Sequence, residues 1–327
     1  MKTSIKVLLL IFACTIQIHA QKIGFLVDDY INERWYTDQK YFTEKVKALG
    51  GEVLVEVAYS DTTQQLDLAK KLIGLGAKVL VVIPTDSHQA AKIADLAKKS
   101  GVAVVSYDRL ILSENIAAYI SYDNRKVGRL QAQYALEKMP QGKFILMNGP
   151  PSDNNALLFK AGQEEVLAPS IKNGKVQVMA NFVMDDWGQL GSYMKLQDFF
   201  SKTTERPDAI VVANDELATG VIQALPKEIT GKTIVTGQDA DLTGIKNIVA
   251  GSQSMTVYKP IKPLAEKAAE IAMQLARGSA IKGLTKTNLG TVTVNAILLD
   301  PVTVDKSNYM ETVIKDGQVK LSDLKTN

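Results

Sequence analysis

Short apolar runs rich in β-branched residues alternate with amphipathic stretches along the first part of the chain. The pattern predicts strands at 22–29, 53–58, 79–83, 102–106 and 118–121, with helices at 33–49, 63–75 and 88–99. Near-continuous apolar strands separated by helices are typical of a parallel sheet covered on both faces. Gly50, Gly76 and Gly101 each stand where a helix should end and a strand begin, as helix C-caps do.

The alternation starts again in the middle of the chain, which predicts a second α/β unit. Helices are expected at 125–138, 155–167, 189–202, 216–225 and 242–249, and strands at 144–147, 176–182, 209–213 and 233–236. A third section holds a strand at 254–257, a long helix at 261–277 and a β-rich stretch at 291–299. This late strand and helix need a sheet to join, so the chain is expected to cross back between the two units.

The first 20 residues have the pattern of a secretory signal. Lys2 and Lys6 form a positive start, residues 7–13 form an apolar run, and Ala20 offers a small residue before the cut. The run is too short to span a membrane. Processing as a lipoprotein at Cys14 is the alternative. Either route predicts an exported protein.

Composition narrows the function classes. The chain has 38 Lys+Arg against 35 Asp+Glu and no run of five basic residues, so nothing indicates nucleic-acid binding. Removal of the signal takes away Cys14 and His19 and leaves His88 as the one histidine. Disulfides, a thiol nucleophile and a Cys/His zinc site are then excluded. Because phosphate-binding loops and nucleophile elbows are also missing, we predict a binding protein with no cofactor and no metal.

Polar clusters follow nearly every predicted strand, at the rim where α/β sheets bind their ligands. The clusters are Asp28-Asp29 followed by Arg34-Trp35, then Tyr107-Asp108-Arg109, Tyr122-Asp123-Asn124, Asp153-Asn154-Asn155, Asp185-Asp186-Trp187, Asn214-Asp215, Gln238-Asp239 and Tyr258-Lys259. Aspartate and asparagine at such places are often helix caps, and Asp215 and Asp123 fit that interpretation. Arginine and tryptophan are poor caps, and core packing does not readily explain two tryptophans in such loops.

The chemistry of these clusters suits a neutral, polyhydroxylated ligand. Each sugar hydroxyl donates and accepts a hydrogen bond, so carboxylates, amides and cations can all contact it. The C–H face of a sugar ring packs on an aromatic plane. Acids and bases are nearly balanced in the set, which disfavours a phosphate or dinucleotide.

Several segments resemble the periplasmic sugar-binding proteins of ABC importers, and most closely their xylose-binding branch. They are Glu33-Arg34-Trp35, Tyr107-Asp108-Arg109, residues 119–124 with Val127-Gly128, residues 153–156, residues 237–242 with 244–246, and residues 255–261. The resemblance spans residues 22–320, with departures near His88, at 284–295 and in the C-terminal segment.

The resemblance implies two doubly wound parallel-sheet lobes joined by a three-segment hinge, with the sugar held between them. The implied lobes are 21–126 plus about 258–288, and 127–257 plus about 289–327. The implied sugar contacts are Arg34, Trp35, Asp108, Arg109, Asp153, Asn155, Trp187, Asn214, Asp239 and Lys259.

The family's function implies capture of a monosaccharide, D-xylose or a related aldose, by a periplasmic monomer that delivers it to a membrane ABC permease. A sensor that presents the sugar to a histidine kinase or chemoreceptor would use the same cleft. The effector domain of a transcription repressor shares the fold, but the signal peptide and the missing helix-turn-helix argue against it. An enzyme acting on sugars lacks a cofactor motif and a catalytic set.

Overall fold

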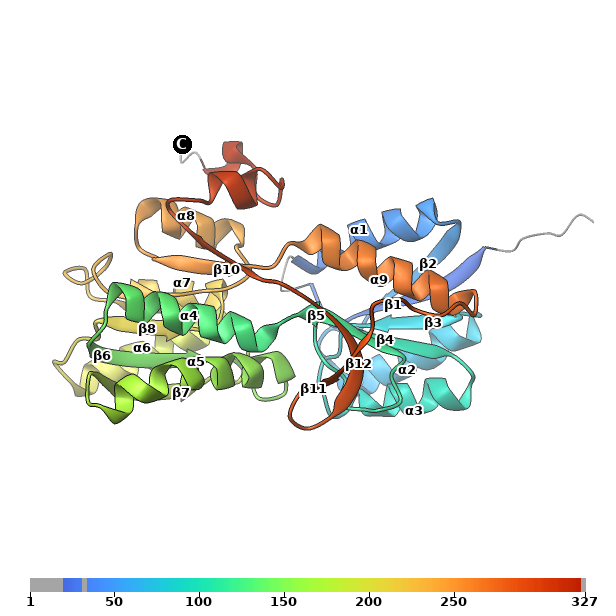
Figure 1. Ribbon diagram of the computed structural model, residues 1–327, viewed down its shortest axis with the longest axis horizontal. Helices are drawn as coiled ribbons and strands as arrows, with labels where there is room; N and C mark the ends of the chain where they lie inside the picture. The colour runs from blue at the N-terminus through green and yellow to red at the C-terminus, as the bar shows by residue number, and fades with distance from the viewer. Residues whose placement is uncertain (1–19, 31–33, 325–327) are drawn as a thin grey trace, which may run out of the picture.

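A computed structural model describes residues 20–30 and 34–324. The predicted signal, with Cys14, lies outside these residues except for Ala20, and Glu33 of the predicted first helix lies outside them too. The described chain forms two α/β lobes that lie side by side (Figure 1). Within the described ranges, no helix is both long and apolar enough to cross a membrane.

The first lobe is built on a seven-stranded sheet with the order β11-β12-β5-β4-β3-β1-β2. Its strands are β1 (Gln21–Val27), β2 (Gly51–Val57), β3 (Val79–Val82), β4 (Ala103–Tyr107), β5 (Ala118–Tyr122), β11 (Thr285–Asn288) and β12 (Thr293–Leu299). All neighbours are parallel except β11 and β12. The helices α1 (Arg34–Ala48) and α9 (Ile261–Ala276) contribute to one core cluster, and α2 (Thr62–Gly74) and α3 (Ala91–Lys99) to another. The sheet is therefore doubly wound, as predicted.

Local capping explains where the first lobe's helices begin and end. The Asp61 carboxylate accepts hydrogen bonds from the first-turn N–H groups of α2, which otherwise lack partners. Gly50, Gly76 and Gly101 have φ values of +80°, +89° and +69°, which confirms them as helix stops. The predicted start of α3 at His88 is wrong, because the Asp86 carboxylate accepts from the backbone N–H groups of residues 88 and 89 and holds a turn there.

The second lobe has a four-stranded parallel sheet with the order β7-β6-β8-β9. Its strands are β6 (Gly142–Asn148), β7 (Val176–Val183), β8 (Ala209–Val212) and β9 (Ile234–Val235). Its helices are α4 (Asn124–Lys138), α5 (Asn154–Lys172), α6 (Gln189–Lys202), α7 (Asp215–Ala224) and α8 (Leu242–Ala250). The antiparallel pair β10 (Met255–Tyr258) and β13 (Val302–Asp305) extends this lobe. A π-helical turn (Met310–Ile314) and a 3-10 turn (Leu321–Leu324) follow, and Figure 1 places this C-terminal segment beside α8.

The chain passes between the lobes three times: from β5 to α4, from β10 to α9 and from β12 to β13 (Figure 1). Hydrogen bonds tie the three connections together. The Tyr122 hydroxyl donates to the Pro260 carbonyl at 2.6 Å, and the Asp123 N–H donates to the Leu299 carbonyl at 2.9 Å. The connection therefore has the three-segment form that the resemblance implied.

One predicted lobe boundary is wrong. Residues from about 289 onward were expected in the second lobe, but β12 pairs in parallel with β5 of the first lobe, with Ala296 opposite Tyr119. The edge of β5 offers unpaired backbone groups, and the apolar stretch 293–299 satisfies them. The last crossing therefore comes after Leu299, and the second lobe regains the chain at β13.

Candidate functional site

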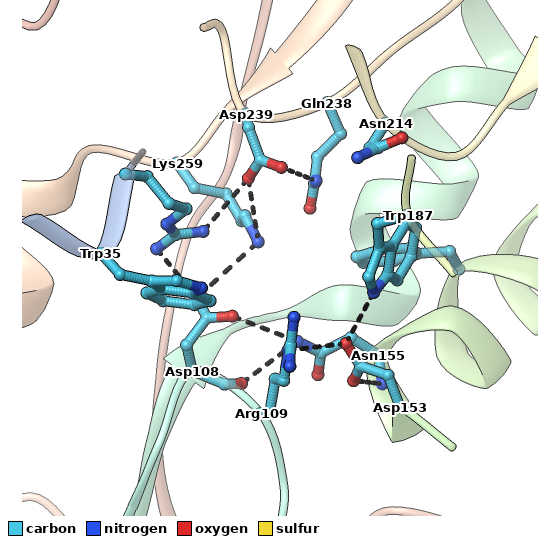
Figure 2. Close-up of a pocket in the computed structure, with 12 residues that line it drawn as sticks. Trp35, Asp108, Arg109, Asp153, Asn155, Trp187, Asn214, Gln238, Asp239 and Lys259 are labelled. Atoms are coloured by element: carbon cyan, nitrogen blue, oxygen red, sulfur yellow. Dashed lines mark hydrogen bonds and ion pairs between the residues drawn. The ribbon is translucent and has the colours of Figure 1, made fainter. Parts of the chain in front are cut away.

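All ten residues expected to contact the ligand line one cavity between the lobes (Figure 2). The cavity lies at the carboxyl ends of the strands, where the rim clusters were predicted to meet. Phe159 and Gln238 complete the lining.

Each lobe supplies part of the lining from turns and helix starts. In the first lobe, Arg34 and Trp35 open α1, and Asp108 and Arg109 follow β4. In the second, Asp153 and Asn214 are the N-caps of α5 and α7, with their side-chain oxygens accepting from backbone N–H groups. For these two residues the capping interpretation and the ligand interpretation are both consistent with the geometry.

The remaining lining residues come from loops and from one of the crossings. Asn155 lies in the first turn of α5, Trp187 precedes α6, and Asp239 lies between β9 and α8. Lys259 lies in the crossing from β10 to α9. Because this crossing joins the two lobes, the Lys259 side chain can contact residues of both.

Arg34 is the centre of one ion-pair network. Its guanidinium lies 3.1 Å from Asp108, 3.1 Å from Asp239 and 3.3 Å from Asp38. Lys259 adds a second cation, 3.4 Å from Asp239 and 3.7 Å from Asp108. Because Arg34 belongs to the first lobe and Asp239 to the second, this network joins the lobes across the cavity.

Arg109 is the centre of a second network. It pairs with Asp28 at 2.6 Å in its own lobe and with Asp153 at 3.1 Å in the other. The Asn155 amide also donates across the gap to the Asp108 carboxylate at 3.2 Å. Together with the Arg34 network, these contacts connect the two lobes across the cavity.

Burial and pairing act in opposite directions on these carboxyl groups. Burial raises the pKa of Asp153, although Arg109 beside it acts to lower it. Burial acts on Asp108 in the same sense, but Arg34, Lys259 and Arg109 together outweigh it and hold the pKa of Asp108 below its ordinary value. The Asp108 carboxylate is therefore a fixed negative charge in the cavity.

Two indole rings lie on opposite sides of the cavity (Figure 2). Trp187 meets Phe159 edge-on with 6.2 Å between ring centroids, and its Nε1 donates to Asp153 at 3.3 Å. Trp35 is 2% exposed and also belongs to the hydrophobic core of the first lobe. Trp187 is partly buried and packs against a core cluster of the second lobe. Core packing, which did not readily explain two tryptophans in such loops, therefore applies to both, and most fully to Trp35. The buried Nε1 of Trp35 has no hydrogen-bond partner in the described protein.

Two lining residues were missing from the predicted site. Gln238 donates to the Asp239 carboxylate at 2.6 Å, while its own Oε1 is buried and unpartnered among the described residues. Gln238 belongs to the predicted rim cluster Gln238-Asp239, so the sequence pattern did point to it. Phe159 lies inside α5, where an apolar residue at helical spacing looks like any core residue.

The arrangement is suited to hold a neutral polar molecule. Carboxylates accept, cations donate, amides do both, and two aromatic walls can cover apolar ring faces. Charge-assisted hydrogen bonds of this kind are stronger than neutral ones. No group of His, Cys, Asp and Glu side chains suited to a metal ion occurs in the described part of the chain.

Comparison with known proteins agrees with this geometry. Residues 23–280 match the model of the periplasmic binding protein domain. The chain is 43% identical to the D-xylose-binding periplasmic protein of Haemophilus influenzae, over 90% of each chain. It is also 43% identical to the protein of that name from Escherichia coli, over 93% of this chain and 92% of the other.

Among solved structures, an ABC transporter solute-binding protein from Clostridium phytofermentans with bound β-D-glucose superposes with a TM-score of 0.86. It is 27% identical, and the match covers 93% of this chain and 100% of that one. By their names these relatives are solute-binding proteins, the function class expected of this chain. The chain belongs to the periplasmic binding protein family.

Proposed function

We propose that this protein captures D-xylose in the cavity between its lobes, in the periplasm, and presents it to an ABC transporter in the membrane. The observation that carries the proposal is the lining of the cavity, in which hydrogen-bonding groups from both lobes surround a space between two indole rings. The choice of D-xylose is supported by the two relatives that are 43% identical and carry that sugar in their names. Transport is favoured over sensing because the solved relative with bound glucose is a transporter component.

Capture follows from closure of the lobes around the sugar. In an open form, Arg34, Asp108 and Arg109 face solvent from one lobe, while Asp153 and Asp239 face it from the other. A sugar that contacts both sets stabilises the closed form over the open one, and the free energy of binding drives the rotation. Closure removes water from the charged groups, which strengthens each of their hydrogen bonds.

The permease then recognises the closed protein as a single rigid surface. Because the sugar contacts lining residues of both lobes, the relative placement of the lobes differs between the sugar-bound and the sugar-free protein. A monomer is sufficient for this function, since every lining group comes from one chain.

A panel of monosaccharides tests the proposal. Both tryptophans of the chain line the cavity, so intrinsic fluorescence should change when a ligand enters. D-xylose at 100 times its Kd should stabilise residues 21–327 by about 2.7 kcal/mol against unfolding. D-glucose, D-ribose and L-arabinose serve as comparisons, with calorimetry giving each Kd.

Two variants separate the site from the rest of the surface. Trp187→Ala should abolish most of the binding, whereas Tyr36→Ala, a 57% exposed aromatic on α1, should leave it unchanged. If no monosaccharide shifts the protein while a phosphorylated sugar or a peptide does, the proposed function is wrong.

A further inference from the structure

Asp239 is held in the cavity by an unusual backbone conformation. Its φ is +100°, and that of the next residue, Ala240, is +53°. Glycine, asparagine and aspartate tolerate positive φ, but other residues rarely adopt it because Cβ then crowds the backbone carbonyl. The steric cost of this turn therefore falls mainly on Ala240. Yet the turn delivers the Asp239 carboxylate to Arg34 at 3.1 Å and to Lys259 at 3.4 Å. Something must therefore hold this turn in place.

The N–H groups of the turn are held from the sheet side. The Asp239 N–H donates to the Val257 carbonyl at 2.9 Å, and the Ala240 N–H donates to the Thr256 hydroxyl at 3.2 Å. That hydroxyl in turn donates to the buried carboxyl group of Asp215 at 3.0 Å. These bonds leave the carbonyl groups of the turn to be fixed from the other side.

The C-terminal segment fixes those carbonyls. The Gln318 amide donates to the Asp239 carbonyl at 2.9 Å and to the Ala240 carbonyl at 3.3 Å. Val313 and Val319, on either side of Gln318, are buried in the same apolar cluster as Ala240. The segment is therefore anchored where its glutamine can reach both carbonyls of the left-handed turn.

We infer that Gln318 is a positioning residue for the sugar site: it holds the turn that places Asp239, although it lies about 80 residues farther along the chain. The inference rests on the proposed function, in which Asp239 contacts the sugar. The C-terminal segment then contributes to ligand affinity, in addition to covering α8. Without the two hydrogen bonds, the turn can relax toward negative φ and carry the Asp239 carboxylate away from Arg34.

The test measures D-xylose affinity in three variants of the full chain. Gln318→Met keeps the bulk of the side chain and removes the donor, and it should raise Kd about three- to tenfold, the effect of one or two ordinary hydrogen bonds. Lys320→Met, an exposed position in the same segment, is the matched control and should bind as the wild type does. Adding Ala240→Gly to Gln318→Met should lower Kd again, because glycine adopts positive φ without strain.

The rescue by glycine distinguishes positioning from a merely structural role. A merely structural role would lower the urea midpoint of the ligand-free protein and leave Kd unchanged. An unchanged Kd in Gln318→Met overturns the inference, and so does a raised Kd that Ala240→Gly fails to lower. If the wild type binds no D-xylose in the same assay, the proposed function fails and this inference fails with it. If the wild type binds D-xylose and Gln318→Met has the same Kd, only the inference is overturned.

Discussion

Gly149 is expected to be essential for the indole wall of the site. It follows β6 and is buried beneath Trp187. A Cβ placed on Gly149 would lie 2.2, 2.3 and 2.7 Å from three carbon atoms of the Trp187 ring. The shortest ordinary contact is 3.4 Å, so the ring must move by at least 1.2 Å to admit a methyl group. The change Gly149→Ala therefore displaces the ring without substituting any polar residue of the cavity.

The size of the effect follows from the cost of overpacking. A methyl group inserted into a filled site typically costs about 1–3 kcal/mol. If Trp187 escapes that cost by leaving its ligand-binding position, binding must restore it, and Kd rises about 5- to 150-fold. The displaced ring also loses its hydrogen bond to Asp153.

Calorimetry with D-xylose measures the change in Kd, and the emission maximum of the ligand-free variant shows whether the indole has moved toward water. Gly74→Ala is the matched control, because Gly74 ends α2 with nothing within 4 Å of an added Cβ. It should bind as the wild type does. Wild-type affinity in Gly149→Ala would refute the argument that this ring position matters for binding.

Three further changes test other parts of the structure. Asp239→Asn keeps the shape of the side chain but removes the charge that faces Arg34. It should raise the Kd for D-xylose at least about tenfold, as loss of a charge-assisted hydrogen bond implies. Calorimetry measures this Kd, and an unchanged value would exclude a role of the carboxylate in binding. The cations around Asp108 outweigh the effect of burial and hold the pKa of its carboxyl group below the ordinary value. The ionised carboxylate therefore stabilises the fold above about pH 3.9, and this stabilisation is lost as the pH falls through the folded-state pKa. Asp108→Asn should therefore lower the urea-unfolding free energy more at pH 7 than at pH 3, and equal losses at both would contradict the shift. Gly128→Ala should destabilise the protein by about 1–3 kcal/mol or more, because its Cβ would lie 1.9 Å from the Phe159 carbonyl oxygen; a wild-type thermal midpoint would show that α4 and α5 can move apart freely.

Local sequence patterns were enough to predict most of the elements. The helix α6 has the bounds that its periodicity predicted, and the glycine stops lie at positive φ. The rim clusters also pointed to one cavity, since the carboxyl ends of parallel strands meet at one edge of each sheet. A local pattern does not show which strand lies next to which. For this reason β12, which pairs with β5 of the first lobe, was assigned to the wrong lobe.

The gaps in the predicted site have physical causes too. Phe159 has the spacing of a core residue, and only the packing of α5 against the cavity gives it a second role. Trp35 could be recognised as a rim residue from its place in the sequence, but its burial depends on α9, which is distant in sequence and contributes to the same core cluster. Gln318 contacts the turn of Asp239 from a segment without regular periodicity, so no local pattern pointed to it.

The place of β12 has a consequence for how the chain is completed during synthesis. The four strands of the second lobe's parallel sheet all lie between residues 142 and 235, so this sheet can assemble before the rest of the chain has been made. The first lobe's sheet has five strands before residue 123 but needs residues 285–299 to cover the edge of β5. Until then that edge is exposed to pairing with other chains. The first lobe's sheet is therefore completed later than the second lobe's parallel sheet, and the edge of β5 stays uncovered until residues 285–299 have been made.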